Sequence, residues 1–343
     1  MSVYKIAIAG AATLAGKELK DAISESPLAA ANFVLLDEDE GLGQLDQVGD
    51  EITFVQAIEP DAFKGCDFTF FCGSTALTKL HWRTALAAGS TVLDMTGALE
   101  DEQGVLICSP WVGSVEMSPD LLTPAVIPAH PAALALALLM ERLGNRAPVR
   151  TVAATLHLPA SEYGKGAMDE LHQQTVNLLS FQSLPRAIYD AQVAFNMMGG
   201  LGENSKASLE ATAARVRRHY VALGGNRLPQ LSLQLLQTPV FHGYTFSIMI
   251  ELERPVEIAA LEEALNGERI DLILEDTDSP SNLSATGQND VLVRLRPELS
   301  ARNPLEATRV WLWAATDNLR MQAGNAVECA LEMRKLRPQG KVQ

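Results

Sequence analysis

The sequence predicts an α/β first part followed by an α+β second part. Three observations carry this prediction. Short apolar strands alternate with helical segments over the first third of the chain, strands later accumulate without helices between them, and the 343 residues exceed what one hydrophobic core usually serves. We therefore expect two domains.

The first part contains four short apolar runs that end in turn residues and predict buried strands: Tyr4–Gly10, Phe33–Asp37, Asp67–Gly73 and Thr91–Met95. Helical spacing lies between them, at Gly16–Ser24 and Thr78–Ala88. Continuously apolar strands that alternate with helices are typical of a parallel, doubly wound sheet. An apolar helix is expected at Pro128–Leu143, where Pro131 suits the first helical turn.

The second part begins with a predicted strand, Arg150–Leu158, and two helices, Tyr163–Leu179 and Ser205–Leu223. The strands that then accumulate are Leu231–Val240, Tyr244–Glu253, Ile270–Glu275, Val291–Leu295 and Thr308–Ala314. They fit an antiparallel sheet, interrupted by a polar loop at Asp276–Asn289. A last helix is expected at Asn318–Arg337.

Composition excludes several classes of function. A net charge of −15 and a pI near 4.9 argue against nucleic-acid binding, which needs clustered Lys and Arg. Four cysteines show no metal-ligand spacing, so we expect buried thiols and no metal site. Neither a signal peptide nor a membrane-spanning stretch is recognisable. We expect a cytoplasmic protein that does not bind membranes.

The strand Tyr4–Gly10 runs through a tight turn into a helix, an arrangement that directs free backbone N–H groups at an anion. The dinucleotide fingerprint requires glycine at three places in such a turn. Gly10 and Gly16 hold the first and last of them, whereas Thr13 holds the middle one, where its side chain would crowd a pyrophosphate. A turn kept only for folding therefore remains an alternative to a nucleotide site, to which Ala12 and Leu14 would also contribute.

The second predicted strand ends at Asp37, the first of four consecutive acidic residues. A carboxylate there can accept hydrogen bonds from ribose hydroxyls, and it repels a 2′-phosphate. The run is equally typical of a solvated loop. Either way, NADP should bind poorly, and any cofactor should be NAD.

Several motifs together resemble the aspartate-semialdehyde dehydrogenase family. They include IAIAGAATLAGKEL in the turn above, FFCGSTALTKLHWRTALAAGSTVLDMTGAL at 70–99, GAMDELHQQTVNLL at 166–179, AFNMMGGLG at 194–202 and DNLRMQAGNAV at 317–327. The resemblance implies a Rossmann-type NAD(P)-binding domain over residues 1–130, joined by the helix 318–343. It also implies an α+β dimerisation domain with a mixed or antiparallel sheet over 131–317, and a homodimer. In the cofactor site it implies Gly73, Ser74 and Glu328, the last where the family has glutamine.

The catalytic motifs of the family are not matched. His130 stands at the position of the cysteine nucleophile, and an imidazole does not simply replace a thiolate. Tyr244 stands at the position of the general-base histidine, and a phenol with an ordinary pKa of about 10 is a poor base near neutrality. Gln237 and Glu100 replace the two substrate-binding arginines. The loop 159–166 has also lost the small residues of the family.

Of the other histidines, His81 and His219 are expected on helix surfaces. Three functions remain open. The leading one is a dimeric family member without the dehydrogenase activity that binds a nucleotide or another small molecule. The second is an NAD-dependent oxidoreductase acting on an aldehyde or oxo group, with His130 and Tyr244 handling protons. The third is a structural dimer with a vestigial cleft.

Overall fold

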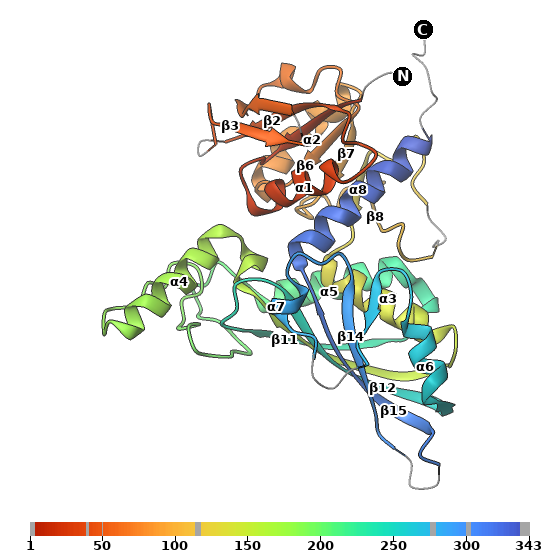
Figure 1. Cartoon of the computed structure of the whole chain (residues 1–343). Coiled ribbons are helices and arrows are strands. Elements are labelled where there is room, and N and C mark those ends of the chain that lie inside the picture. The colour runs from red at the N-terminus through yellow and green to blue at the C-terminus, as the bar shows by residue number, and fades with distance from the viewer. Residues whose placement is uncertain are drawn as a thin grey trace. The chain divides into compact units, whose positions relative to one another are not determined.

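The computed structural model describes residues 4–38, 41–49, 51–113, 118–274, 279–299 and 303–336 (Figure 1). The chain forms two compact units. The first contains the residues up to Ala129 together with those from Gln322 onward, and the second is His130–Met321. Each unit is described by itself.

The first unit is built on a seven-stranded, all-parallel sheet in the order β5-β2-β1-β6-β7-β9-β8. Its strands are β1 (Lys5–Ala9), β2 (Asn32–Asp37), β5 (Gln56–Ala57), β6 (Phe68–Phe71), β7 (Thr91–Asp94), β8 (Leu106–Cys108) and β9 (Ala125–Pro128). The central strands are buried on both faces, which explains their unbroken apolar sequences. The expected parallel sheet is confirmed.

Helices cover both faces of this sheet. On one face, Leu19 of α1 (Leu14–Ser24) and Ala326 of α8 (Asn318–Leu336) pack in the same cluster as Ile6 and Ile8. On the other face, α2 (Thr75–Ala87) packs through a second cluster. A separate hairpin is formed by β3 (Leu45–Val48) and β4 (Glu51–Phe54), and a short 3₁₀ turn lies at Pro60–Phe63.

The second unit contains a six-stranded sheet in the order β11-β10-β12-β15-β14-β13. Its strands are β10 (Val149–Leu158), β11 (Leu231–Gln237), β12 (Tyr244–Glu257), β13 (Ile270–Leu272), β14 (Val291–Pro297) and β15 (Glu306–Thr316). The sheet is mixed, because β11 runs parallel to β10 and β13 runs parallel to β14. The expectation of a mixed or antiparallel sheet is thereby confirmed in its mixed form.

The helices of this unit are α3 (Pro131–Gly144), α4 (Lys165–Leu179), α5 (Leu209–Gly224), α6 (Ile258–Leu265) and the short α7 (Asn282–Ala285). Residues Pro131–Met140 of α3 are all buried, so α3 is the core helix of the unit. The helix expected over 128–143 begins only at Pro131, because the residues before it form β9 and the cap of the helix. Residues 276–278 of the expected polar loop lie outside the described residues, as does Glu275 at the end of the expected strand Ile270–Glu275.

The sheet alternates inward and outward along β12. Tyr244, Phe246, Ile248 and Ile250 are buried, whereas Thr245, Ser247 and Met249 between them are only half-buried. The outward face is therefore the less covered one, and it is distinct from the face that carries the core.

Candidate functional site

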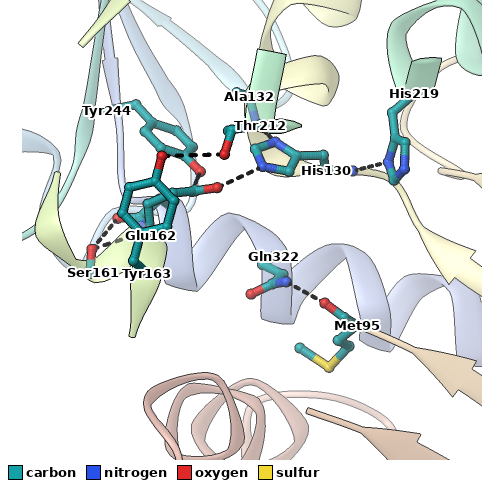
Figure 2. A network of polar contacts seen from close by, with 11 residues as sticks. Met95, His130, Ala132, Ser161, Glu162, Tyr163, Thr212, His219, Tyr244 and Gln322 are labelled. Carbon is teal, nitrogen blue, oxygen red and sulfur yellow. Dashed lines mark hydrogen bonds and ion pairs between the residues drawn. The ribbon is translucent and has the colours of Figure 1, made fainter. Parts of the chain in front are cut away.

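Four side chains meet at the N-terminus of α3 in the second unit (Figure 2). His130 is the residue that caps α3, and Tyr244 is the first residue of β12. Glu162 lies in the 3₁₀ turn Ala160–Tyr163, and His219 lies on the buried face of α5. The structure thus brings together two of the predicted site residues, His130 and Tyr244, and adds two residues to them.

The ring of His130 is held through both of its nitrogens. Nδ1 accepts a hydrogen bond from the backbone N–H of Ala132 at 3.2 Å, and Nε2 lies 3.1 Å from Oε1 of Glu162. A ring nitrogen that accepts from an N–H carries no proton, so the proton sits on Nε2 and is donated to the carboxylate. The backbone N–H of His130 in turn donates to Nδ1 of His219 at 2.8 Å. No ring nitrogen is left as a free nucleophile.

Tyr244 is completely buried and stacks on His130, with ring centroids 6.2 Å apart and an interplanar angle of 18°. Its hydroxyl donates to Oε2 of Glu162. Burial, and then the negative charge and the hydrogen bond of Glu162, raise the pKa of Tyr244 well above its ordinary range. Tyr244 therefore acts as a hydrogen-bond donor near neutral pH and not as a base.

Glu162 is the centre of the cluster, with only 12% of its side chain exposed. Burial acts to raise the pKa of Glu162. The imidazole of His130, the hydrogen bonds from His130 and Tyr244, and the positive charge of Arg215 outweigh it, so the pKa is lowered. A carboxylate is therefore stable here.

The turn that carries Glu162 is fixed by neighbouring segments. The backbone N–H of Ala160 donates to the carbonyl of Val240 at 2.7 Å, and that of Ser161 donates to the carbonyl of Phe241 at 2.9 Å. The Ser161 hydroxyl also exchanges hydrogen bonds with the side-chain amide of Asn318. The backbone that carries the Glu162 carboxylate is consequently fixed in position.

Gln237, a third predicted site residue of the second unit, makes its side-chain hydrogen bonds outside this cluster. Gln237 is fully buried at the end of β11, and its Nε2 donates to the carbonyls of Leu158 (3.2 Å) and Thr238 (3.0 Å). Both amide hydrogens are thereby used, whereas no partner is recorded for Oε1 among the described residues. Glu100 belongs to the first unit, half-buried in the turn that follows β7.

The glycines of the β1–α1 turn are required by geometry. Gly10 has a φ of +94°, and a Cβ there would lie 2.3 Å from the backbone nitrogen of Gly73. A Cβ at Gly16 would lie 2.3 Å from the carbonyl oxygen of Gly10. The turn is therefore packed directly against the end of β6, where Ser74 begins α2 by capping the N–H of Leu77.

Thr13 is engaged inside this turn. Its hydroxyl accepts from the N–H of Gly16 (3.0 Å) and lies within donating distance of the carbonyls of Gly10 (2.7 Å) and Cys72 (2.9 Å). No acceptor is recorded, within the described part of the chain, for the N–H groups of Leu14 and Ala15 in the first turn of α1. These two groups and the helix dipole suit a phosphate.

Asp37 lies at the end of β2, as expected. One carboxylate oxygen accepts from the N–H of Ala12 at 2.7 Å and the other from the N–H of Glu38 at 2.8 Å. A carboxylate has about four acceptor positions, so capacity for a ribose hydroxyl remains. Asp39 and Glu40 lie outside the described residues. Glu328 is half-buried on α8.

The sequence analysis missed two members of the cluster. Glu162 is not indicated by its local sequence, because the loop 159–166 is notable only for the loss of the family's small residues. His219 was expected on a surface and is buried, 2% exposed. The signal was present, because His219 lies three residues after the buried Val216 and so on the apolar face of α5.

Comparison with known proteins places the chain in a family. A model described as semialdehyde dehydrogenase, NAD binding domain, matches residues 5–118, and one described as semialdehyde dehydrogenase, dimerisation domain, matches residues 141–321. The second match alone spans more than half of the chain. The chain belongs to the semialdehyde dehydrogenase family, which confirms the resemblance in the sequence motifs.

Relatives match along nearly the whole chain. A USG-1 protein homolog of Pseudomonas aeruginosa is 27% identical over 331 residues, covering 94% of this chain and 95% of its own. An aspartate-semialdehyde dehydrogenase of Rickettsia bellii is 23% identical over 337 residues, covering 97% and 98%. The solved structure of a probable aspartate-semialdehyde dehydrogenase from Pseudomonas aeruginosa superposes with a TM-score of 0.85 at 25% identity, covering 97% of this chain and 99% of its own.

The described ranges contain neither a cluster of metal ligands nor a membrane-spanning helix. No group of three or more His, Cys, Asp or Glu side chains there could hold a metal ion. No helix in that part of the chain is long and apolar enough to cross a membrane.

Proposed function

We propose that this family member does not carry out the acylating dehydrogenase reaction, and that it acts as a dimeric protein with a nucleotide-binding turn. The observation that carries the proposal is the state of His130. Its Nδ1 accepts from the backbone N–H of Ala132 and its Nε2 donates to Glu162. Acyl transfer needs an available lone pair on the attacking atom, and neither nitrogen offers one.

Proton transfer fails for a related reason. A general base should have a pKa near the working pH, whereas the pKa of Tyr244 is raised far above it. The alternative of an oxidoreductase in which His130 and Tyr244 move protons loses support from the same geometry. A bound nicotinamide would supply a hydride donor or acceptor, but these two residues are committed to Glu162 and to the helix cap.

The charges of the site also oppose an acyl phosphate substrate. Gln237 uses both amide hydrogens on backbone carbonyls and so has no donor left for a carboxylate. Glu162 places a stable negative charge beside the nucleophile position, and Glu100 stands where the resemblance implies a phosphate-binding arginine. An anionic substrate would be repelled by these groups.

For the nucleotide we propose NAD rather than NADP. The free N–H groups of Leu14 and Ala15 would hold a phosphate, and Asp37 would accept from a ribose hydroxyl. The same carboxylate would repel a 2′-phosphate. A cytoplasmic location is part of the proposal, since all four cysteines are free thiols.

We further propose that the chain forms a homodimer through its second unit, which the dimerisation-domain model matches. The outward face of the sheet supports this, because Met249 and Trp311 lie side by side there and Trp311 is 42% exposed. A soluble monomer rarely leaves such an apolar surface uncovered.

Turnover of aspartate semialdehyde with NADP and phosphate tests the catalytic part of the proposal. We expect no rate above background for the purified protein, and no change in that background for the variant His130→Ala. A rate that His130→Ala abolishes would overturn the proposal, since it would identify His130 as a working residue. An equal rate in the natural protein and in His130→Ala would come from a contaminating enzyme. Expression in a host that lacks its own aspartate-semialdehyde dehydrogenase removes that contaminant.

A restored variant provides the positive control. His130→Cys, Tyr244→His, Gln237→Arg and Glu100→Arg together reintroduce the residues that the resemblance implies. Their thermal unfolding should be recorded beside the assay, because His130 also caps α3. Turnover in this variant and not in the natural protein would show that these four positions are what separates the chain from an active enzyme.

A further inference from the structure

Two cysteines of the first unit lie side by side, although they are 221 positions apart in the sequence. Cys108 ends the edge strand β8, and Cys329 belongs to α8 (Figure 1). Cys108 packs against the hydrophobic cluster that contains Cys329. The sulfur of Cys329 lies 3.7 Å from the carbonyl oxygen of Cys108. A disulfide requires two cysteines that approach each other this closely, and such an approach is not indicated by the local sequence of either.

A small network of hydrogen bonds fixes the position of the two cysteines. The carbonyl of Cys108 also accepts the backbone N–H of Ala129, at 2.9 Å. Asn325 is fully buried and lies one helical turn before Cys329. Its side-chain amide donates to the carbonyl of Ala129 at 3.3 Å, and its Oδ1 lies 3.9 Å from the sulfur of Cys329. The pair is therefore held on one side by the residue that follows β9 and on the other by α8.

The two thiols differ in exposure and in acidity. All four cysteines of the chain lie in its described part, and Cys108 alone among them is half-buried while the others are buried. A hydrogen bond to Cys108 and burial raise the pKa of Cys329 well above its ordinary range, and the nearby charges of Glu328 and Glu332 add to the shift. Cys108 is consequently the thiol that an oxidant can reach, and Cys329 is protonated near neutral pH.

We propose that Cys108 and Cys329 form a reversible disulfide when the protein meets a hydroperoxide, and that this bond fixes α8 to the edge strand of the first unit's sheet. In the first step the sulfur of Cys108 attacks one oxygen of the peroxide. The O–O bond breaks, which gives a sulfenic acid and, from hydrogen peroxide, water. The sulfur of Cys329 then attacks the sulfur of Cys108, and the displaced hydroxyl leaves as water with the Cys329 proton. The two thiols lose two electrons and the peroxide gains them.

The bond changes how firmly the C-terminal helix is held. The residues from Gln322 onward join the first unit, whose other residues end at Ala129, and packing and hydrogen bonds hold them there. A disulfide between positions 108 and 329 closes a loop of 221 positions and so restricts the unfolded chain. Disulfides in a reducing cytoplasm are usually transient and often sense oxidants. The pair is thus suited to stabilise the first unit during oxidation and to release α8 afterwards.

Peptide mapping of the full chain under non-reducing conditions tests whether the bond forms. Trypsin places Cys108 in fragment 84–142 and Cys329 in fragment 321–334, whereas Cys66 and Cys72 share fragment 65–79. We expect hydrogen peroxide to join fragments 84–142 and 321–334 within one chain, and dithiothreitol to separate them. Fragment 65–79 should keep two free thiols and is the internal control. A link between other cysteines, a link between two chains, or oxidation of Cys108 without a link would overturn the inference.

Two variants test the order of the steps. Cys329→Ala keeps the accessible thiol and removes its partner, so Cys108 should accumulate as a sulfenic acid that dimedone captures. Cys108→Ala should give neither a link nor capture of dimedone at Cys329. Cys66→Ala removes a different buried thiol, so it is the matched control and should form the link as the natural protein does. Serine replaces alanine in any variant that does not fold. Capture of dimedone at Cys329 in Cys108→Ala would overturn the assigned roles.

The effect on α8 is measured on the same samples. We expect oxidation to raise the melting temperature by about 5 °C or more, and to slow amide hydrogen exchange in residues 322–334 at least about tenfold. Both changes should occur in the natural protein and in Cys66→Ala, and neither in Cys108→Ala. A bond that forms without these changes, or that lowers the melting temperature, would overturn the conclusion that it fixes α8.

Discussion

Nδ1 of His219 accepts the backbone N–H of His130 at 2.8 Å, so a histidine of α5 supports the residue that begins α3. Both residues are buried. The contact joins two helices that pack together in the second unit. It also gives an acceptor to the backbone N–H of His130, which would otherwise be buried without a partner.

Removal of this acceptor should destabilise the protein. We expect His219→Ala to lower the free energy of unfolding by about 2–3 kcal/mol, because a buried N–H loses its partner and a cavity forms. Urea unfolding followed by circular dichroism measures the change. His172→Ala, at an exposed position of α4, is the control and should fall within about 0.5 kcal/mol of the natural protein. Equal effects of the two substitutions would contradict the assigned role.

Glu162 should make a pH-dependent contribution to stability. The pKa of its carboxyl is lowered in the folded protein, so its contribution is present above the ordinary value of about 4.3 and is lost as the pH falls through the folded value. We expect Glu162→Gln to cost about 1–3 kcal/mol near pH 7, and the difference from the natural protein to shrink below about pH 4. Unfolding curves at a series of pH values measure this. Glu203→Gln, at an exposed position, should show no comparable trend.

The close approach at the β1–α1 turn can be tested with two glycines of similar backbone conformation. Gly10 and Gly65 have φ values of +94° and +71°, but only at Gly10 would a Cβ strike backbone, whereas at Gly65 nothing lies within 4 Å. We expect Gly65→Ala to cost about 1–2 kcal/mol and Gly10→Ala at least about 3 kcal/mol. Thermal unfolding compares them. Similar costs would mean that the turn relaxes away from Gly73.

The cofactor preference depends on Asp37. We expect calorimetry to show tighter binding of NAD than of NADP, and a ligand present at 100 times its Kd should add about 2.7 kcal/mol of stability. Asp37→Ser should narrow the difference, since the repulsion of a 2′-phosphate is removed, whereas Glu38→Gln leaves Asp37 in place and should preserve most of it. Tighter binding of NADP by the natural protein would refute the assignment. If neither NAD nor NADP bound, the result would favour a β1–α1 turn that serves folding alone.

The fold was largely predictable from the sequence, and the exceptions have physical reasons. Strands such as Phe68–Phe71 predict a parallel sheet because they are apolar on both faces. The alternation in β11 reports one buried face but not the direction of the strand. The two helices α4 and α5 between β10 and β11 provide a crossover long enough for a parallel pair, and this could have signalled the mixed sheet.

The cluster around α3 was less predictable, because it depends on contacts between distant segments. His130 and Tyr244 could be found from their places in family motifs. Glu162 is separated from Tyr244 by 82 residues, and no local pattern indicates that their side chains meet. A carboxylate beside a histidine and a tyrosine is recognisable only once the fold places them together.

The capping of α3 by His130 limits which amino acids position 130 can accept during evolution. Residues Pro131–Met140 of that helix are all buried. The backbone N–H groups of a first helical turn have no acceptor within the helix, and here the imidazole of His130 accepts the N–H of Ala132. Replacing that imidazole by a thiol would at once uncap the helix and leave the anionic Glu162 without its neighbour. The single substitution His130→Cys would therefore give a less stable protein. The residues around position 130 thus disfavour a return to a thiol there unless they change as well.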